Sequence, residues 1–179
     1  EQIEQAKIWC RCMGISQISM EGVEADDVMG SIAVQMQASH QASVYLCTSD
    51  KDMGQVVGPS VFLLNTFKEN QILDERGVEA QFGVSPRQIV DFLTLTGDVS
   101  DNVPGVSGFG PKTAADYLQK FGSLEVILEL PEHVLGEKKW LALQQAKATM
   151  AVSRQLLALS TRLAVPQHLE EMALQDADM

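Results

Sequence analysis

Residues 42–48 form a continuous apolar and β-branched run without strict alternation, and two aspartates follow it within four residues. Such a run is typical of a strand covered on both faces, as in a parallel sheet. Weaker strand patterns occupy residues 14–20 and 61–64, and helical spacing is present over residues 1–13 and 24–38. This alternation predicts an α/β fold built on an open, mostly parallel sheet with right-handed crossovers.

From about residue 75 the pattern changes to helices. Ser85 and Pro86 begin one predicted helix, and Pro111 begins another that runs to about residue 121. A third is expected over residues 137–160, in a stretch with no acidic residue between 138 and 169. We therefore divide the chain into a partial α/β core (1–80), a helix-hairpin-helix module (81–130) and a C-terminal helical region with an acidic tail (131–179).

Composition restricts the class of protein. Thirteen Lys and Arg against 24 Asp and Glu give a net charge of −11, which argues against a chain that grips nucleic acid by bulk positive charge. Three cysteines are too few for a disulfide framework and suit a reducing compartment, so we expect a cytoplasmic (bacterial) or organellar protein. No run of about 18 apolar residues occurs, and no membrane span is predicted.

Seven carboxylates occur in three clusters, each at the predicted boundary of an element. The first cluster lies at the start of a helix, where the helix dipole stabilises acidic side chains even when they bind no ligand. The second follows a predicted buried strand, where open α/β sheets bind ligands. The third ends a helix, which costs about 0.3–1 kcal/mol for each acid unless a cation offsets it. The clusters are Glu24, Asp26 and Asp27; Asp50 and Asp52; Asp98 and Asp101.

If these carboxylates share one crevice, hard cations must lie among them, and Mg²⁺ or Mn²⁺ suits oxygen ligands. When these seven acids are left out of the charge count, 17 acidic residues remain against 13 basic ones. The rest of the surface is then only mildly acidic, and the net charge does not argue against a polyanionic substrate. Two metal ions about 4 Å apart can hydrolyse a phosphodiester, with water as the nucleophile and no catalytic side chain beyond the ligands.

The stretch between the two middle helices, residues 104–114, is rich in glycine and resembles a helix-hairpin-helix. In that motif backbone N–H groups at the start of the second helix face a phosphate, and Lys112 would add a point charge. An ordinary helix-helix turn is the alternative. The candidate DNA-binding residues are Gly105, Ser107, Gly108, Gly110, Lys112 and Thr113.

These motifs, in this order over about residues 1–130, resemble the 5′-nuclease family, which includes the amino-terminal domains of bacterial DNA polymerase I. The resemblance implies that the seven carboxylates are metal ligands and that residues 85–122 form a helix-three-turn-helix that holds duplex DNA. It also implies a K⁺-like ion bound by backbone carbonyls near residues 106–108. The implied activity is metal-dependent 5′-3′ exonuclease or flap endonuclease cleavage, as part of a DNA polymerase I in DNA replication and repair.

Family members also carry, upstream of the region matching Glu1, a strand with another ligand aspartate and a basic helical arch that this chain lacks. We therefore expect these 179 residues to bind duplex or 5′-flapped DNA but to cleave it poorly without that segment. Two alternatives stay open. One is a non-catalytic duplex-binding fragment that holds metal without turnover, and the other is a metal-dependent ribonuclease, which the hairpin disfavours.

Overall fold

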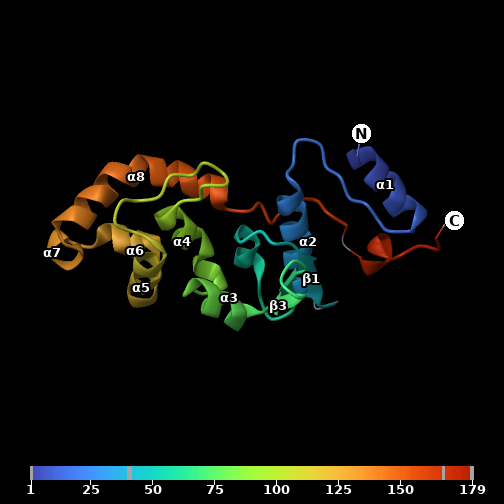
Figure 1. The fold of residues 1–179 in the computed structure, drawn as a ribbon, viewed down its shortest axis with the longest axis horizontal. Helices are drawn as coiled ribbons and strands as arrows, with labels where there is room; N and C mark the ends of the chain where they lie inside the picture. Colours follow the sequence, from blue (N-terminus) through green and yellow to red (C-terminus); the bar gives the residue numbers. More distant parts are fainter. Residues whose placement is uncertain (1, 40–41, 167, 178–179) are drawn as a thin grey trace. The chain divides into compact units, whose positions relative to one another are not determined.

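The computed structural model describes residues 2–39, 42–166 and 168–177 (Figure 1). The chain divides into two compact units. One comprises Glu1–Val44 with Ser160–Met179, and the other comprises Tyr45–Leu159. Within the described ranges no helix is both long and apolar enough to cross a membrane.

The first unit contains helices α1 (Gln2–Cys12) and α2 (Ala25–Ser39) and the 3₁₀ turn η3 (Leu169–Met172). Helix α2 buries Val28, Ala33 and Met36. The extended chain that begins at Ser160 is fastened to it, because Ser31 Oγ donates to Ser160 O at 2.9 Å and accepts from Leu163 N at 3.2 Å. Helix α1 has no buried residue. Both predicted helices of this region are therefore confirmed.

The predicted strand over residues 14–20 is wrong, since this segment is irregular. Its apolar residues Ile15 and Ile18 remain exposed, so no buried face stabilises a strand there. Gly14 has a left-handed φ of 70°, and its carbonyl accepts from Gln175 N at 2.8 Å. The segment is thus held by the C-terminal tail and by no neighbouring strand in the described chain.

The sheet has three strands in the order β1 (Val44–Cys47), β2 (Val61–Asn65) and β3 (Gln71–Leu73). It is mixed, with β2 and β3 antiparallel. The α/β class is as predicted, but β3 was not foreseen. The expectation that β1 is covered on both faces is also wrong for the described chain, because Leu46 is buried whereas Tyr45 and Cys47 are exposed.

Helices make up the rest of the second unit, and α4 lies at their centre, packed against α5 and α8 (Figure 1). The buried side chains of Ile89, Leu93 and Leu95 on α4 form the middle of this core. The three helices predicted here are confirmed. The elements are η1 (Asp52–Val56), α3 (Glu75–Phe82), η2 (Pro86–Gln88), α4 (Ile89–Thr96), α5 (Pro111–Phe121), α6 (Leu124–Glu129), α7 (Glu132–Leu135) and α8 (Glu137–Leu157).

A buried polar contact fixes α6 and α8 to α4. Asp91 Oδ2 accepts from Leu124 N at 2.9 Å, and Asp91 Oδ1 pairs with Arg154 Nη2 at 2.9 Å. Arg154 also pairs with Glu125. Burial raises the pKa of Asp91, although the Leu124 N–H and Arg154 act against that rise. These contacts fix the helix whose end carries the third acidic cluster.

Candidate functional site

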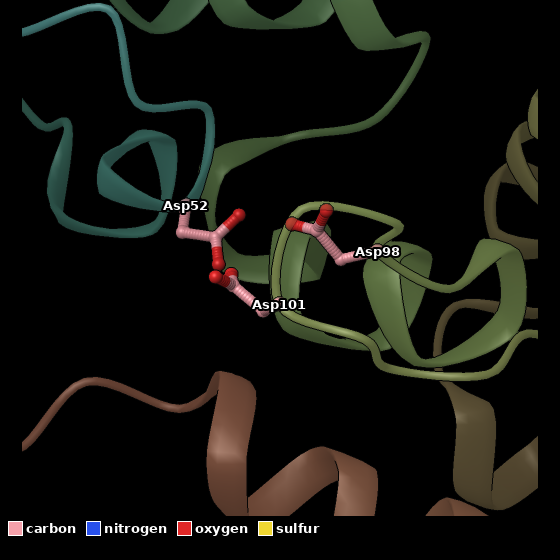
Figure 2. Close-up of side chains that lie close together, drawn as sticks. All are labelled: Asp52, Asp98 and Asp101. Atoms are coloured by element: carbon pink, nitrogen blue, oxygen red, sulfur yellow. The ribbon is translucent and has the colours of Figure 1, made fainter.

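Three carboxylates of the second unit converge. The side chains of Asp52, Asp98 and Asp101 place one oxygen each within 4.8 Å of one another (Figure 2). Asp52 is the first residue of η1, which follows β1, whereas Asp98 and Asp101 lie in the loop after α4. Two of the three predicted clusters therefore meet, although more than 40 residues separate them in the sequence.

The loop after α4 is shaped by its backbone. Gly97 ends the helix with a left-handed φ of 77°, and its N–H donates to Leu93 O at 2.7 Å. Asp98 and Val103 then exchange two backbone hydrogen bonds of 2.7 and 2.8 Å, which close a tight turn. Within it Asp98 Oδ1 accepts from Ser100 N at 2.8 Å. This turn brings Asp98 and Asp101 to the same side.

Asp52 has the environment of a metal ligand. Its Oδ1 atom is buried and makes no hydrogen bond within the part of the chain that the structure describes. Burial, and next the negative charge of Asp50, raise the pKa of Asp52 to about 6. A buried carboxylate oxygen without a donor is costly unless a cation or a proton satisfies it. The three-carboxylate site therefore fits a hard divalent cation.

Asp50 lies beside the same site. It lines a cavity of about 360 Å³ together with Lys51, Asp98 and Asp101. Its Oδ1 atom accepts from Asp52 N at 2.9 Å, and this contact orients the start of η1. Three of the seven predicted ligands, Asp50, Asp98 and Asp101, thus line one cavity of the second unit, and Asp52 lies close to two of them.

The remaining predicted ligands belong to the first unit. Glu24 directly precedes α2, and Asp26 and Asp27 lie in its first turn, as expected from their helix-start pattern. Asp27 Oδ1 accepts from Ser160 N at 2.8 Å. Their participation in the metal site stays a prediction.

Lys51 is a site residue that sequence analysis did not assign. Its Nζ atom donates to Asp98 Oδ2, and the Asp98 side chain is only 3% exposed. Burial alone would raise the pKa of Asp98, but the hydrogen bonds from Lys51 and Ser100 hold this pKa below its ordinary value. The ammonium group therefore supplies positive charge beside the cluster. Its position between two predicted ligand aspartates was the only signal in the sequence.

The hairpin between α4 and α5 is anchored by its apolar residues. Val106 N donates to Leu95 O at 2.8 Å, and Phe109 N donates to Val106 O at 3.0 Å. Phe109 is fully buried and packs edge-on against Tyr117, with ring centroids 5.4 Å apart. Ser107 and Gly108, which lie between these anchors, are exposed. The predicted hairpin therefore presents its backbone to solvent.

Helix α5 begins at Pro111, with Gly110 as its N-cap. The first helical hydrogen bond from this turn is Ala114 N to Gly110 O at 2.9 Å, so the N–H groups of Lys112 and Thr113 have no acceptor within the helix. Lys112 is exposed beside them. Gly105 differs, because a Cβ atom there would lie 2.3 Å from Thr96 O. It allows the hairpin to approach the end of α4.

A second lysine borders the hairpin. Lys139 in the first turn of α8 places its Cγ 3.6 Å from where a Cβ atom of Gly108 would be. Its Nζ lies 5.9 Å from the centroid of the Tyr117 ring. Lys139 was not among the predicted DNA-binding residues, because about 30 residues separate it from the hairpin. The acid-free stretch after residue 138 was the one available signal.

Comparison with known proteins agrees with these motifs. Residues 1–83 match the family described as "5'-3' exonuclease, N-terminal resolvase-like domain", and residues 84–179 match "5'-3' exonuclease, C-terminal SAM fold". DNA polymerase I of Pseudomonas aeruginosa is 37% identical over 96% of this chain, which covers 19% of the polymerase. Flap endonuclease Xni of Pectobacterium carotovorum is 35% identical over 97% of this chain, which covers 66% of that enzyme.

Solved structures show the same fold. The 5′-exonuclease of bacteriophage T5 superposes with a TM-score of 0.75 at 24% identity, over 89% of this chain and 64% of that one. The catalytic core of Rad2 in complex with DNA superposes with a TM-score of 0.62 at 16% identity, over 98% of this chain and 60% of that one. The family identified from the acidic and glycine-rich motifs is confirmed, and the chain belongs to the 5′-3′ exonuclease family.

Proposed function

We propose that this chain forms part of a structure-specific 5′-nuclease that hydrolyses DNA phosphodiesters, acting on duplex or 5′-flapped DNA. One observation carries the proposal: the carboxylates of Asp52, Asp98 and Asp101 converge, and one Asp52 oxygen is buried without a hydrogen-bond donor among the described residues. The chain spans 16–66% of the length of the first curated relatives, so the activity of the whole protein is part of this proposal.

Asp50, Asp52, Asp98 and Asp101 would hold two Mg²⁺ or Mn²⁺ ions, with Glu24, Asp26 and Asp27 as further ligands. When bound, such ions activate water and stabilise the leaving oxygen of the phosphodiester. The carboxylates fix the position of the cations, and the tight turn from Asp98 to Val103 keeps two of the ligands in place. Lys51 adds a positive charge that can face the substrate phosphate.

The hairpin would hold the backbone of the duplex. The free N–H groups at the start of α5 and the exposed Lys112 recognise phosphate geometry and offer no base-edge code. Lys139 adds a second charge at Gly108. A K⁺ ion bound by carbonyls near residues 106–108 is part of the same proposal. Gly105, Ser107, Gly108, Gly110, Lys112 and Thr113 would make up the contact surface, within a module of residues 81–130 flanked by regions 1–80 and 131–179.

The relatives support this assignment. Xni is named a flap endonuclease, and the T5 enzyme has been solved as a complex with DNA and metal ions. Several relatives are DNA polymerase I, which makes a polymerase region a proposed partner and DNA replication and repair the proposed setting.

The test combines metal binding with cleavage. Calorimetry should show Mn²⁺ uptake that weakens by more than about tenfold in Asp98→Asn and Asp101→Asn, because each variant loses a charged oxygen ligand. Glu79→Gln on α3 removes an equal charge outside the cluster and is the matched control. Undiminished uptake in both cluster variants would refute the metal site.

Cleavage is then measured in single turnover with Mg²⁺ on a 5′-flapped duplex and on single-stranded RNA. If the chain cleaves the flap and Asp98→Asn does not, the result supports the proposed nuclease activity. The chain could instead take up metal and bind duplex without cleaving it, even after the remaining part of a full-length relative is added. That result would favour the non-catalytic binding fragment. Preference for RNA would favour the ribonuclease.

A further inference from the structure

A second cavity of about 290 Å³ adjoins the metal site within the same unit. Thr48, Ser49, Asp50 and Lys51 line both cavities, so the segment after β1 is a wall shared by the two. The volume lies close to the lower end of the range for small-molecule sites, which begins at about 300 Å³. A chemical group bound here would be directly beside one bound at the carboxylates.

The other walls combine apolar and polar chemistry. Leu63 and Leu73 contribute buried side chains from β2 and β3. The Phe67 side chain, 89% exposed, also lines the cavity. Asn65 and Gln81 add amide groups at the walls. A flat aromatic ring together with amide groups matches what a nucleobase requires, a stacking face and partners for its polar edge.

The turn that carries Phe67 is well defined. Phe67 N donates to Asn65 Oδ1 at 3.0 Å, and Gln71 N donates to Lys68 O at 2.8 Å. Asn65 and Gln71 are paired across β2 and β3, so the turn begins and ends at a fixed register. These contacts order the backbone, and yet folding leaves the Phe67 ring in solvent.

Charge decides which part of a nucleotide fits. Asp50 and Lys51 both lie in the wall, but the Lys51 ammonium group is paired with Asp98, so a phosphate inside the cavity would meet the carboxylate of Asp50. A neutral base avoids that repulsion. Lys68 lines the same cavity and is exposed, so its long side chain can pair with a phosphate outside the cavity.

We propose that this cavity binds one unpaired nucleobase of the DNA substrate, stacked on Phe67, while a neighbouring phosphate lies at the carboxylate site. The inference rests on the proposed function. The base must be unpaired, because a base within a duplex has both faces stacked and its edge in use. Stacking tolerates every base, so the cavity selects for single-stranded structure next to the cleavage point and imposes no sequence.

The experiment is a double-mutant cycle on the full chain in Ca²⁺. The probe is a duplex with a 5′ single-stranded extension, in which each unpaired nucleotide near the junction is replaced in turn by an abasic one. Phe67→Ala should weaken binding by about 5- to 150-fold, the effect of losing one stacked base. One abasic position should cause the same loss in the original chain and no additional loss in Phe67→Ala. Phe67→Trp should bind at least as tightly as the original chain.

Two controls separate this inference from others. Tyr45→Ala removes another exposed aromatic ring of the sheet, outside the cavity, and should leave affinity unchanged. Blunt duplex should bind Phe67→Ala normally, since the hairpin holds it. Additive losses at every abasic position, or no loss in Phe67→Ala, would overturn the base assignment alone. Displacement of the extension by thymidine monophosphate would make a free nucleotide the ligand, which also overturns it. Failure of the original chain to bind any duplex would overturn the proposed function as well.

Discussion

Replacing Lys51 by Met should tighten metal binding, although it alters a residue of the site. In the structure Lys51 Nζ is bound to Asp98, a predicted ligand whose side chain is almost fully buried. A divalent cation must displace this ammonium group or remain close to it. Lys51→Met removes the competing charge and keeps a side chain of similar length.

The size of the effect follows from Coulomb's law. Two unit charges 4 Å apart interact by about 1 kcal/mol in water, and a divalent cation doubles this to about 2 kcal/mol, or roughly 30-fold in affinity. The water value is a lower limit, because the Lys51 side chain is only 35% exposed and the Asp98 side chain 3%. Without metal, Lys51→Met should also unfold at a lower temperature, since Asp98 loses its counter-charge.

Calorimetric titration with Mn²⁺ at constant ionic strength measures this change. Lys120→Met is the matched control, because Lys120 lies over the Phe121 ring, 5.0 Å from its centroid, in the last turn of α5. It should show only a small shift from the change in net charge. Equal or weaker Mn²⁺ binding by Lys51→Met would refute the argument and would make Lys51 a support of the ligand geometry.

Three further predictions concern other parts of the second unit. Lys139→Ala should reduce the slope of log affinity for duplex against log salt by about 0.9, because one phosphate contact is lost. Lys138→Ala, at the exposed neighbouring position, should leave the slope unchanged, and equal slopes in both variants would argue against a contact at the hairpin. Mn²⁺ affinity should fall as the pH drops through about 6, because protonated Asp52 cannot hold a cation. If the affinity stayed the same between pH 7 and pH 5, this would contradict the role of Asp52 as a ligand. Arg154→Leu should lower the free energy of unfolding by about 1–3 kcal/mol at pH 7, measured with denaturant, and by less at acidic pH, where Asp91 with its raised pKa is protonated and needs no counter-charge.

The sequence predicted those elements whose signals are local. Pro111 and the N-cap Gly110 mark the start of α5, and the acidic clusters do lie at element boundaries. The strand β3 was missed because its turn lacks an Asn-Gly or Asp-Gly pair, and Glu69 and Asn70 adopt left-handed conformations instead, with φ of 51° and 57°. The wrong strand over residues 14–20 arose from scattered apolar residues that no neighbour buries.

Contacts between distant elements could not be predicted in this way. The pairing of Asp91 with Arg154 depends on how α8 packs against α4, and the position of Lys139 beside Gly108 depends on the same packing. A single sequence contains the charges but not the partner of each charge. The convergence of Asp52 with Asp98 was predictable only because both were already assigned to metal binding.

The loop that carries Asp98 and Asp101 touches the hairpin through its backbone. A Cβ atom on Gly97 would lie 2.4 Å from Gly105 N, and one on Gly105 would lie 2.3 Å from Thr96 O, so the two backbones touch where both residues lack side chains. Because Gly97 immediately precedes Asp98 and Gly105 opens the hairpin, this contact places Asp98 close to the hairpin backbone. A duplex held at the hairpin would then present its backbone to the carboxylates at one register. Positioning of this kind contributes to catalysis without any chemical group of its own.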